Sequence, residues 1–196
     1  MYKISLQERA TSYNKAFPKY PPLVCTDRWI YGIWMIGNNY RNKMGYYGEY
    51  PQSYIKRVKS IFPDATNILH LFSGIVKSKG GITFDIRPEL KPDVIGDAHN
   101  LSNYFPPNCF DLIMADPPYS QEDSEHYGTP MINRNKVLKE CYKVLKPQGF
   151  ICWLDTVLPM YRKDELLLVG TIGMIRSTNH RFRVLSIFNY SYKEEV

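Results

Sequence analysis

The sequence lacks the residue spacings of a structural metal site. Its 196 residues include four Cys and four His, with no C-x-x-C pair and no Cys/His cluster at zinc spacing. Cys109, Cys141 and Cys152 lie in or beside apolar runs, so we expect buried free thiols, which suit a reducing cytosol. We therefore predict a cytoplasmic protein that holds no metal.

Long uncharged apolar runs and a basic-then-apolar leader are also missing. A membrane-spanning helix needs about 20 apolar residues, so neither a span nor secretion is expected. The chain has no internal repeat, low-complexity tract or linker, and its length suits a single domain. We expect an N-terminal arm and helical extension over 1–64 and a catalytic core over 65–196.

Charge and aromatic content are the first positive signals. The formal net charge is +6 and 16 residues are Tyr. A basic excess favours polyanionic partners such as nucleic acid, whose phosphates dominate affinity. Tyrosine-rich surfaces often contact bases, although a tyrosine-rich core is equally compatible with this composition.

The N-terminal third gives mixed signals. "FPKYPPL" predicts an extended arm within 1–24, and the apolar run 29–36 fits either a strand or a helix. "PQSYIKRVKSIF" predicts a helix over 51–62 with Pro51 at its first position. Its apolar side chains share one face, and the basic residues from Lys56 to Lys59, Arg57 included, are expected off that face.

From residue 67 onward, strands alternate with connections. The expected strands are 67–72, 81–86, 92–98, 109–119 ("CFDLIMADPPY") and 150–158, with a helix over 131–145 and a terminal hairpin over 166–193. The strands do not alternate in polarity, which indicates an α/β fold whose parallel sheet is covered on both faces. Asp85, Asp97 and Asp116 come at strand carboxyl ends, the edge where such sheets bind ligands.

The stretch "FDLIMADPPYS" has the most specific chemistry. Proline fixes its own φ and holds the preceding residue extended, so Asp116 and the Pro117 carbonyl present two acceptors side by side. Two acceptors suit an amino group, which has two hydrogens to donate. Polarised in this way, its nitrogen lone pair is freed for attack, while Tyr119 stacks on the ring that carries the amine.

These residues resemble the class I S-adenosylmethionine-dependent methyltransferases, in particular the nucleic-acid amino-methyltransferases with a DPPY motif. The resemblance covers roughly 65–192 and implies a Rossmann-like sheet with a C-terminal antiparallel hairpin. DPPY at 116–119 is its specific part, and implies catalytic roles for Asp116, Pro117, Pro118 and Tyr119. "LHLFSG", "FDI" and "GDAHNL" match the cofactor motifs.

The same resemblance implies the S-adenosylmethionine contacts. Asp85 would bind the ribose hydroxyls, Asp97 the adenine amine, and the Ala98 backbone a ring nitrogen. The complete predicted set is His70, Phe72, Ser73, Gly74, Asp85, Ile86, Asp97, Ala98, Tyr47 and Tyr50. The last two come from the N-terminal region. Only "SGIVKSKG" joins the first two core strands, so the first crossover helix is predicted to be short or missing.

Two further regions bear on substrate binding. The polar segment 120–130 after DPPY fits either a lid or a solvated loop. Arg41, Lys43, Arg181 and Arg183 are predicted nucleic-acid contacts. Because no insertion is large enough for a target-recognition domain, we expect short or relaxed sequence specificity.

The sequence therefore predicts S-adenosylmethionine-dependent methylation of the exocyclic amine of a nucleic-acid base, foremost adenine N6 in DNA. Two alternatives stay open. One is an RNA or tRNA adenine methyltransferase with the same chemistry. The other is a non-catalytic subunit that keeps the fold to bind nucleic acid.

Overall fold

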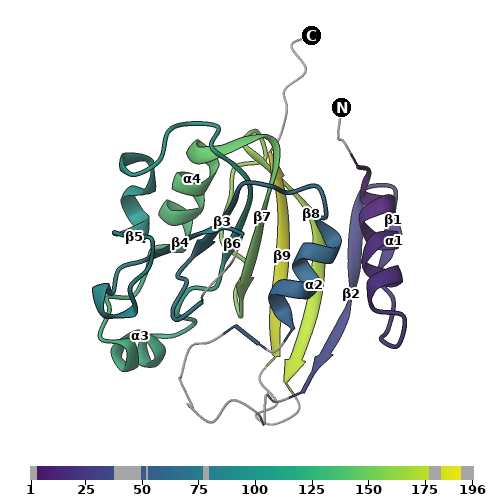
Figure 1. The fold of residues 1–196 in the computed structure, drawn as a ribbon, viewed down its shortest axis with the longest axis horizontal. Helices are drawn as coiled ribbons and strands as arrows, with labels where there is room; N and C mark the ends of the chain where they lie inside the picture. Colours follow the sequence, from purple (N-terminus) through teal and green to yellow (C-terminus); the bar gives the residue numbers. More distant parts are fainter. Residues whose placement is uncertain (1–3, 38–49, 52, 77–79, 177–181, 191–196) are drawn as a thin grey trace.

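The computed structural model describes residues 4–37, 50–51, 53–76, 80–176 and 182–190 (Figure 1). Its helices are α1 (Leu6–Ala16), α2 (Tyr54–Ile61), α3 (Gln121–Tyr127) and α4 (Arg134–Val144), with short 3-10 turns η1 (Pro88–Leu90) and η2 (Ala98–Asn103). Its strands are β1 (Val24–Thr26), β2 (Trp29–Ile36), β3 (Ile68–Leu71), β4 (Ile82–Asp85), β5 (Val94–Ile95), β6 (Phe110–Ala115), β7 (Leu145–Asp155), β8 (Leu166–Arg176) and β9 (Phe182–Tyr190).

The described strands form one nine-stranded sheet in the order β1-β2-β8-β9-β7-β6-β3-β4-β5. Strands β7, β6, β3, β4 and β5 run parallel to one another, whereas β9 is antiparallel to both β7 and β8. The predicted fold class is confirmed: an α/β Rossmann-like methyltransferase sheet, mostly parallel, with a C-terminal antiparallel hairpin. The described part of the connection from β3 to β4 contains turns and no helix, as the short "SGIVKSKG" segment predicts.

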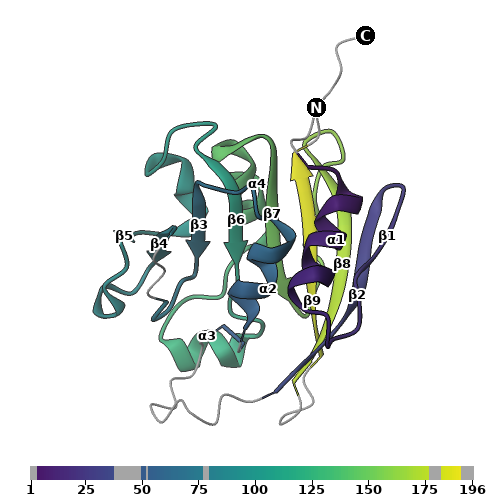
Figure 2. The same cartoon turned by 45° about the vertical axis from the view of Figure 1, so that its right-hand side comes forward.

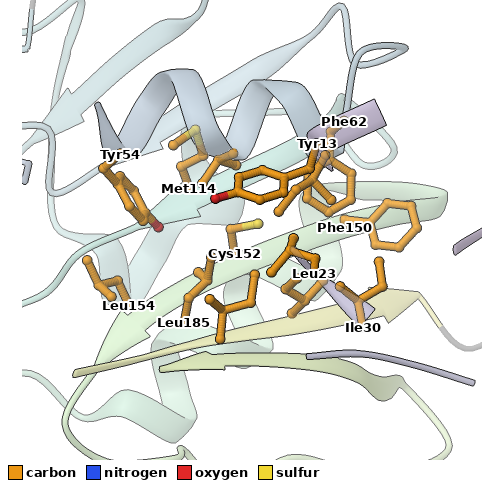
Figure 3. Packing of buried hydrophobic residues seen from close by; sticks show 14 of the residues in the cluster. Tyr13, Leu23, Ile30, Tyr54, Phe62, Met114, Phe150, Cys152, Leu154 and Leu185 are labelled. Atoms are coloured by element: carbon orange, nitrogen blue, oxygen red, sulfur yellow. The ribbon is translucent and has the colours of Figure 1, made fainter. Parts of the chain in front are cut away.

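Helices cover both faces of the sheet (Figure 2). On one face, α1 and α2 lie over a cluster that includes Tyr13, Val58, Met114 and Cys152 (Figure 3). On the other face, α4 and η2 pack on residues such as Ile113, which neighbours Met114 in β6 but points the opposite way. Strands buried on both sides explain the absence of alternating polarity in the sequence.

The N-terminal segment corrects one prediction, because residues 6–16 form helix α1 rather than an extended arm. Ser5 caps the helix: its hydroxyl accepts from the Glu8 amide at 3.2 Å, while the Glu8 carboxylate accepts from the Ser5 amide at 2.8 Å. This S-x-x-E capping box is a helix-start signal. The prolines that suggested an arm all come after the helix ends.

Segment 29–36, which fits two conformations by sequence, is strand β2. Ile30, Trp34 and Ile36 are buried, and the intervening Tyr31 and Met35 are exposed, which is the period of a strand. β2 pairs in parallel with β8 and so extends the sheet beyond the hairpin. Together with β1 and α1, it forms the part of the domain that precedes the core motifs.

Helix α2 confirms the expected helix but corrects the position of Arg57. Arg57 is buried, its guanidinium donates to the Tyr13 hydroxyl, and its Cζ lies 4.3 Å from the centre of the Tyr20 ring. It therefore joins α2 to α1 and is no surface contact for phosphate. Pro51 lies before the N-cap residue Ser53, outside the helix. No helix among the described residues is long and apolar enough to cross a membrane.

Candidate active site

The predicted site residues gather at the point where the strand order reverses. The chain proceeds from β3 outward to β4 and β5, then returns to β6 on the other side of β3 and continues to β7. In open α/β sheets, ligands bind outside the carboxyl ends of the strands at this switch point. Phe72, Ser73 and Gly74 follow β3 directly, and Asp116 follows β6, so the two motifs flank the reversal. Helix α3 lies at the same end of the sheet (Figure 2).

Asp116 is the best-defined group of the site. Its Oδ1 accepts a hydrogen bond from the Tyr119 hydroxyl. Burial raises the pKa of Asp116 to about 6, against the opposing effects of the Arg183 charge and the Tyr119 hydrogen bond, while Asp155 and Asp123 raise it further. The carboxyl is therefore mostly ionised at neutral pH and is protonated by mild acid. Pro117 is buried beside it.

Two arginines hold Tyr119. Arg134, at the start of α4, donates from Nη2 to the Tyr119 carbonyl at 2.8 Å and from Nε to Asp155 Oδ2 at 2.7 Å. Asp155, at the end of β7, is only 1% exposed and also accepts from the Trp153 indole at 3.2 Å. From β9, the Arg183 guanidinium lies 4.5 Å from the centre of the Tyr119 ring. The turn after β6 is thus fixed through both its backbone and its aromatic ring.

Arg134 and Asp155 are functional candidates that the sequence analysis missed. A usable signal for Asp155 is its place at the end of the fifth core strand, in "FICWLD", the same position that singled out Asp85 and Asp97. Arg134 has no comparable signal, because an arginine in the first turn of an amphipathic helix is ordinary. Its partner and its target come together only in the folded chain.

The loop after β3 forms a cradle against the end of β4. Phe72 and Gly74 have positive φ of 59° and 56°, and the Gly74 amide donates to Asp85 Oδ2 at 2.9 Å. A bulky residue held at positive φ is uncommon and marks a constrained, often functional turn. The Ser73 side chain is buried, and no described residue forms a hydrogen bond with its hydroxyl. Asp85 Oδ1 accepts from the Arg87 amide at 3.1 Å.

Asp97 and Ala98 lie one strand further along the same edge, after β5. Asp97 caps η2: its Oδ1 accepts from the His99 amide at 2.9 Å and contacts His99 Nδ1 at 2.7 Å. The side chain of Asp97 is 44% exposed, so its carboxylate also remains accessible to a ligand. Ala98 is buried, and Ile86, which follows Asp85, is exposed.

Tyr50 and His70 lie on the side of the sheet covered by α2. The Tyr50 hydroxyl donates to the Met114 carbonyl at 3.2 Å, and its ring stacks on Tyr54 with centroids 5.0 Å apart. Burial, aided by the Lys59 charge, lowers the pKa of His70 to about 4, so this imidazole is neutral at physiological pH. Both His70 ring nitrogens are buried, and neither has a hydrogen-bond partner in the part of the chain that the structure describes.

Segment 120–130, left open between a lid and a solvated loop, contains helix α3. Ser120 caps it by accepting from the Asp123 amide at 3.1 Å, and Gly128 ends it with φ of 66°. The side chains of Asp123 and Ser124 are buried, which a solvated loop would leave exposed. The Arg87 guanidinium lies 5.0 Å from the centre of the Tyr127 ring, so α3 rests beside the residue that contacts Asp85.

Of the four predicted nucleic-acid contacts, one lies among the described residues. Arg41, Lys43, Arg181 and the predicted cofactor contact Tyr47 lie outside the described residues. Arg183 is described, but it is only 8% exposed and points to Tyr119 rather than to solvent. Within the described ranges, no group of three or more His, Cys, Asp or Glu side chains is arranged to hold a metal ion.

Known proteins offer limited comparison. No family model matches the chain, and no curated protein matches its sequence. Among solved structures, TrmN from Thermus thermophilus is similar at 14% identity and a TM-score of 0.46; the match covers 64% of this chain and 44% of TrmN. The N-methyltransferase NodS from Bradyrhizobium japonicum, solved with S-adenosyl-L-homocysteine, is similar at 11% identity and a TM-score of 0.44, over 65% of this chain and 79% of NodS. At these TM-scores neither likeness says what this chain acts on.

Proposed function

We propose that this protein transfers a methyl group from S-adenosylmethionine to the exocyclic amine of a nucleic-acid base, adenine N6 in DNA, with short or relaxed sequence specificity. One observation carries the proposal. The Asp116 carboxylate and the Tyr119 side chain lie at the carboxyl end of β6, across the switch point from the Gly74–Asp85 cradle. An amine acceptor and a cofactor cradle thus lie at the same edge of the sheet, on either side of the switch point.

The groups around the cradle fit the cofactor. The unpartnered Ser73 hydroxyl and the accessible Asp97 carboxylate supply a polar group and an acceptor for adenosine and methionine polar groups. Asp85 already accepts from Gly74 and Arg87, but each carboxylate oxygen has a second lone pair for a ribose hydroxyl. S-adenosylmethionine supplies an electrophilic methyl group on a sulfonium sulfur.

The chain's own contribution is to position and polarise the amine. Asp116 and the Pro117 carbonyl would accept its two hydrogens, which would free the nitrogen lone pair to receive the methyl group that the bound cofactor supplies. The product nitrogen carries a positive charge and loses its proton to water. No general base is required.

We expect the Tyr119 hydroxyl to give up its place on Asp116 Oδ1 to the amine, so that the ring is free to stack on the base. The ring then offers a stacking surface for a base that has been turned out of the helix or is already single-stranded. The contact between Tyr119 and Asp116 therefore corresponds to the state without substrate. It keeps the buried carboxylate hydrogen-bonded until the amine replaces it.

A radiolabelled methyl donor tests this function with double-stranded DNA, single-stranded DNA, RNA and protein offered separately. We expect label in DNA from wild type and none from Asp116→Ala. Label in RNA alone would select the RNA or tRNA methyltransferase instead. If the wild-type protein binds nucleic acid but labels no substrate, and so behaves as Asp116→Ala does, the alternative of a non-catalytic binding subunit would be selected.

A further inference from the structure

Arg183 occupies an unusual position for an arginine in a hairpin strand. It lies near the start of β9, opposite Met174 of β8, and its side chain is more than nine-tenths buried. Its guanidinium covers one face of the Tyr119 ring with Cζ 4.5 Å from the ring centre, and its Nε has no hydrogen-bond partner among the described residues. A buried, incompletely paired cation requires a compensating interaction.

Two neighbours provide that compensation. The face of an aromatic ring attracts a cation, more strongly when both are desolvated. The second neighbour is the Asp116 carboxylate, whose pKa is lowered by the Arg183 charge against the larger effect of burial. Arg183 therefore interacts with both the residue that would accept the amine and the residue that would stack on the base.

We propose that Arg183 is a positioning residue for methyl transfer: it covers one face of the Tyr119 ring, which leaves the other face for the base, and its charge sustains Asp116 as a carboxylate. This inference rests on the proposed function and deepens it. It replaces the expectation that Arg183 contacts phosphate, since a guanidinium buried under the ring is not presented to a nucleic-acid backbone.

Other titratable groups also face Asp116, and they limit how far the Arg183 charge lowers its pKa. Those on neighbouring elements are Asp155 of β7, Asp123 of α3, Tyr119 of its own turn, Tyr54 of α2 and Tyr50. Asp155 and Asp123 raise the pKa of Asp116, and the tyrosines are neutral. Among the described residues, Arg183 is the cation whose charge opposes them. Its removal is therefore expected to raise the pKa of Asp116.

The test compares Arg183→Met, which removes the charge, with Arg183→Lys, which keeps the charge but not the planar guanidinium. Arg162→Met is the matched control, because Arg162 is exposed and paired with Asp164. We expect Arg183→Met to lower kcat at least tenfold, to leave the affinity for S-adenosylmethionine within twofold of wild type, and to move the acid limb of kcat/KM to higher pH. Arg183→Lys is expected to restore the acid limb and only part of kcat.

Two results would overturn the proposal. One is an Arg183→Met variant whose kcat is within twofold of wild type and whose kcat/KM falls at the same acidic pH as that of wild type. The other is a raised KM for DNA and a weaker salt dependence at unchanged kcat, which would identify Arg183 as a phosphate contact after all. Carbon-13 NMR titration of Asp116 separates this question from the function itself, since it needs no substrate. A pKa of Asp116 that is the same in Arg183→Met as in wild type would refute the charge role even if no substrate were ever methylated.

Discussion

The Asp116 side chain is largely buried, and burial disfavours the negative charge that its proposed role requires. It accepts the amine only as a carboxylate, and burial raises its pKa to about 6. We therefore predict that kcat/KM falls as the pH drops through about 6, because kcat/KM reports ionisation in the free enzyme. The pH profile of initial rates measures this. A profile flat down to pH 4.5 would show that the carboxylate is not needed or that its pKa is not raised.

The raised pKa also predicts an effect on stability. A carboxyl whose pKa is higher in the folded state favours folding most below its unfolded pKa, and this contribution is lost as the pH rises through the folded value. From 3.8 to about 6, the loss amounts to at most about 3 kcal/mol above pH 7. Asp116→Asn should thus be more stable than wild type at pH 7.5 by about 1–3 kcal/mol, although inactive, with the difference shrinking towards pH 4. Urea unfolding at both pH values measures it, and a destabilised Asp116→Asn would contradict it.

Two variants of Tyr119 distinguish the role of its hydroxyl from the role of its ring. Its hydroxyl competes with the amine for Asp116, whereas its ring is the proposed stacking surface. Tyr119→Phe should therefore keep kcat within about tenfold of wild type, while Tyr119→Ala should lose about 1–3 kcal/mol of base binding, seen as a higher KM. Steady-state kinetics on one DNA substrate distinguish the two variants. Equal losses in both would mean that the hydroxyl, not the ring, matters.

Residue roles are predictable from the sequence only where the chain itself brings the groups together. Asp116, Pro117 and Tyr119 are consecutive or nearly so, and backbone chemistry already fixes their relation. Arg134, Asp155 and Arg183 reach the same turn from α4, β7 and β9. Their spatial arrangement depends on strand order and register, which local patterns do not specify. The sequence alone therefore predicts phosphate binding for Arg183, whereas the structure places its guanidinium against Tyr119.

At the scale of elements, the ion pair between Arg134 and Asp155 connects α4 with β7, and Arg134 also binds the turn after β6. Removing one partner of a buried ion pair leaves an uncompensated charge and costs about 3–5 kcal/mol. We predict that Arg134→Met loses about 3 kcal/mol of unfolding free energy, since Arg134 is partly exposed. It should also lower kcat more than Asn135→Ala, a neighbour in the same helix.

A double-mutant cycle provides the control for that pair. Arg134→Met combined with Asp155→Asn removes both charges and should be more stable than Arg134→Met alone. Additive losses, measured by urea unfolding of the four proteins, would show that the two side chains do not interact. In either case the activity of the double variant should stay low, because nothing then holds the Tyr119 carbonyl.

Most elements of the core follow from apolar periodicity, and the exceptions have physical explanations. Most core strands are apolar runs, and an acid stands at or just after the end of β4, β5, β6 and β7, so their pattern is strong. Helix α1 was missed because its signal is a capping box on a largely polar helix, and the neighbouring prolines suggested extension. Helix α3 is too short for an apolar period, and its end is marked only by Gly128.

At the scale of the whole molecule, the sheet places the site and the N-terminal region widens the sheet. β1 and β2 extend it past β8, while α2 covers the face beside β3 and β6 (Figure 2). A Cβ on Gly80 would lie 3.5 Å from Lys59 Nζ, so α2 reaches the short connection that follows β3. The helix thus lies where a longer first crossover would otherwise supply cover.

The identity of the methylated nucleoside tests the central claim most directly. DNA treated with the protein and isotopically labelled S-adenosylmethionine is digested to nucleosides and resolved by mass spectrometry. The proposed function predicts labelled N6-methyldeoxyadenosine from wild type and none from Asp116→Ala; the arrangement of Asp116 and Tyr119 itself requires only that the label be on an exocyclic amine. Label on a ring carbon or a ring nitrogen instead of an exocyclic amine, or equal label from Asp116→Ala, would contradict the proposed site.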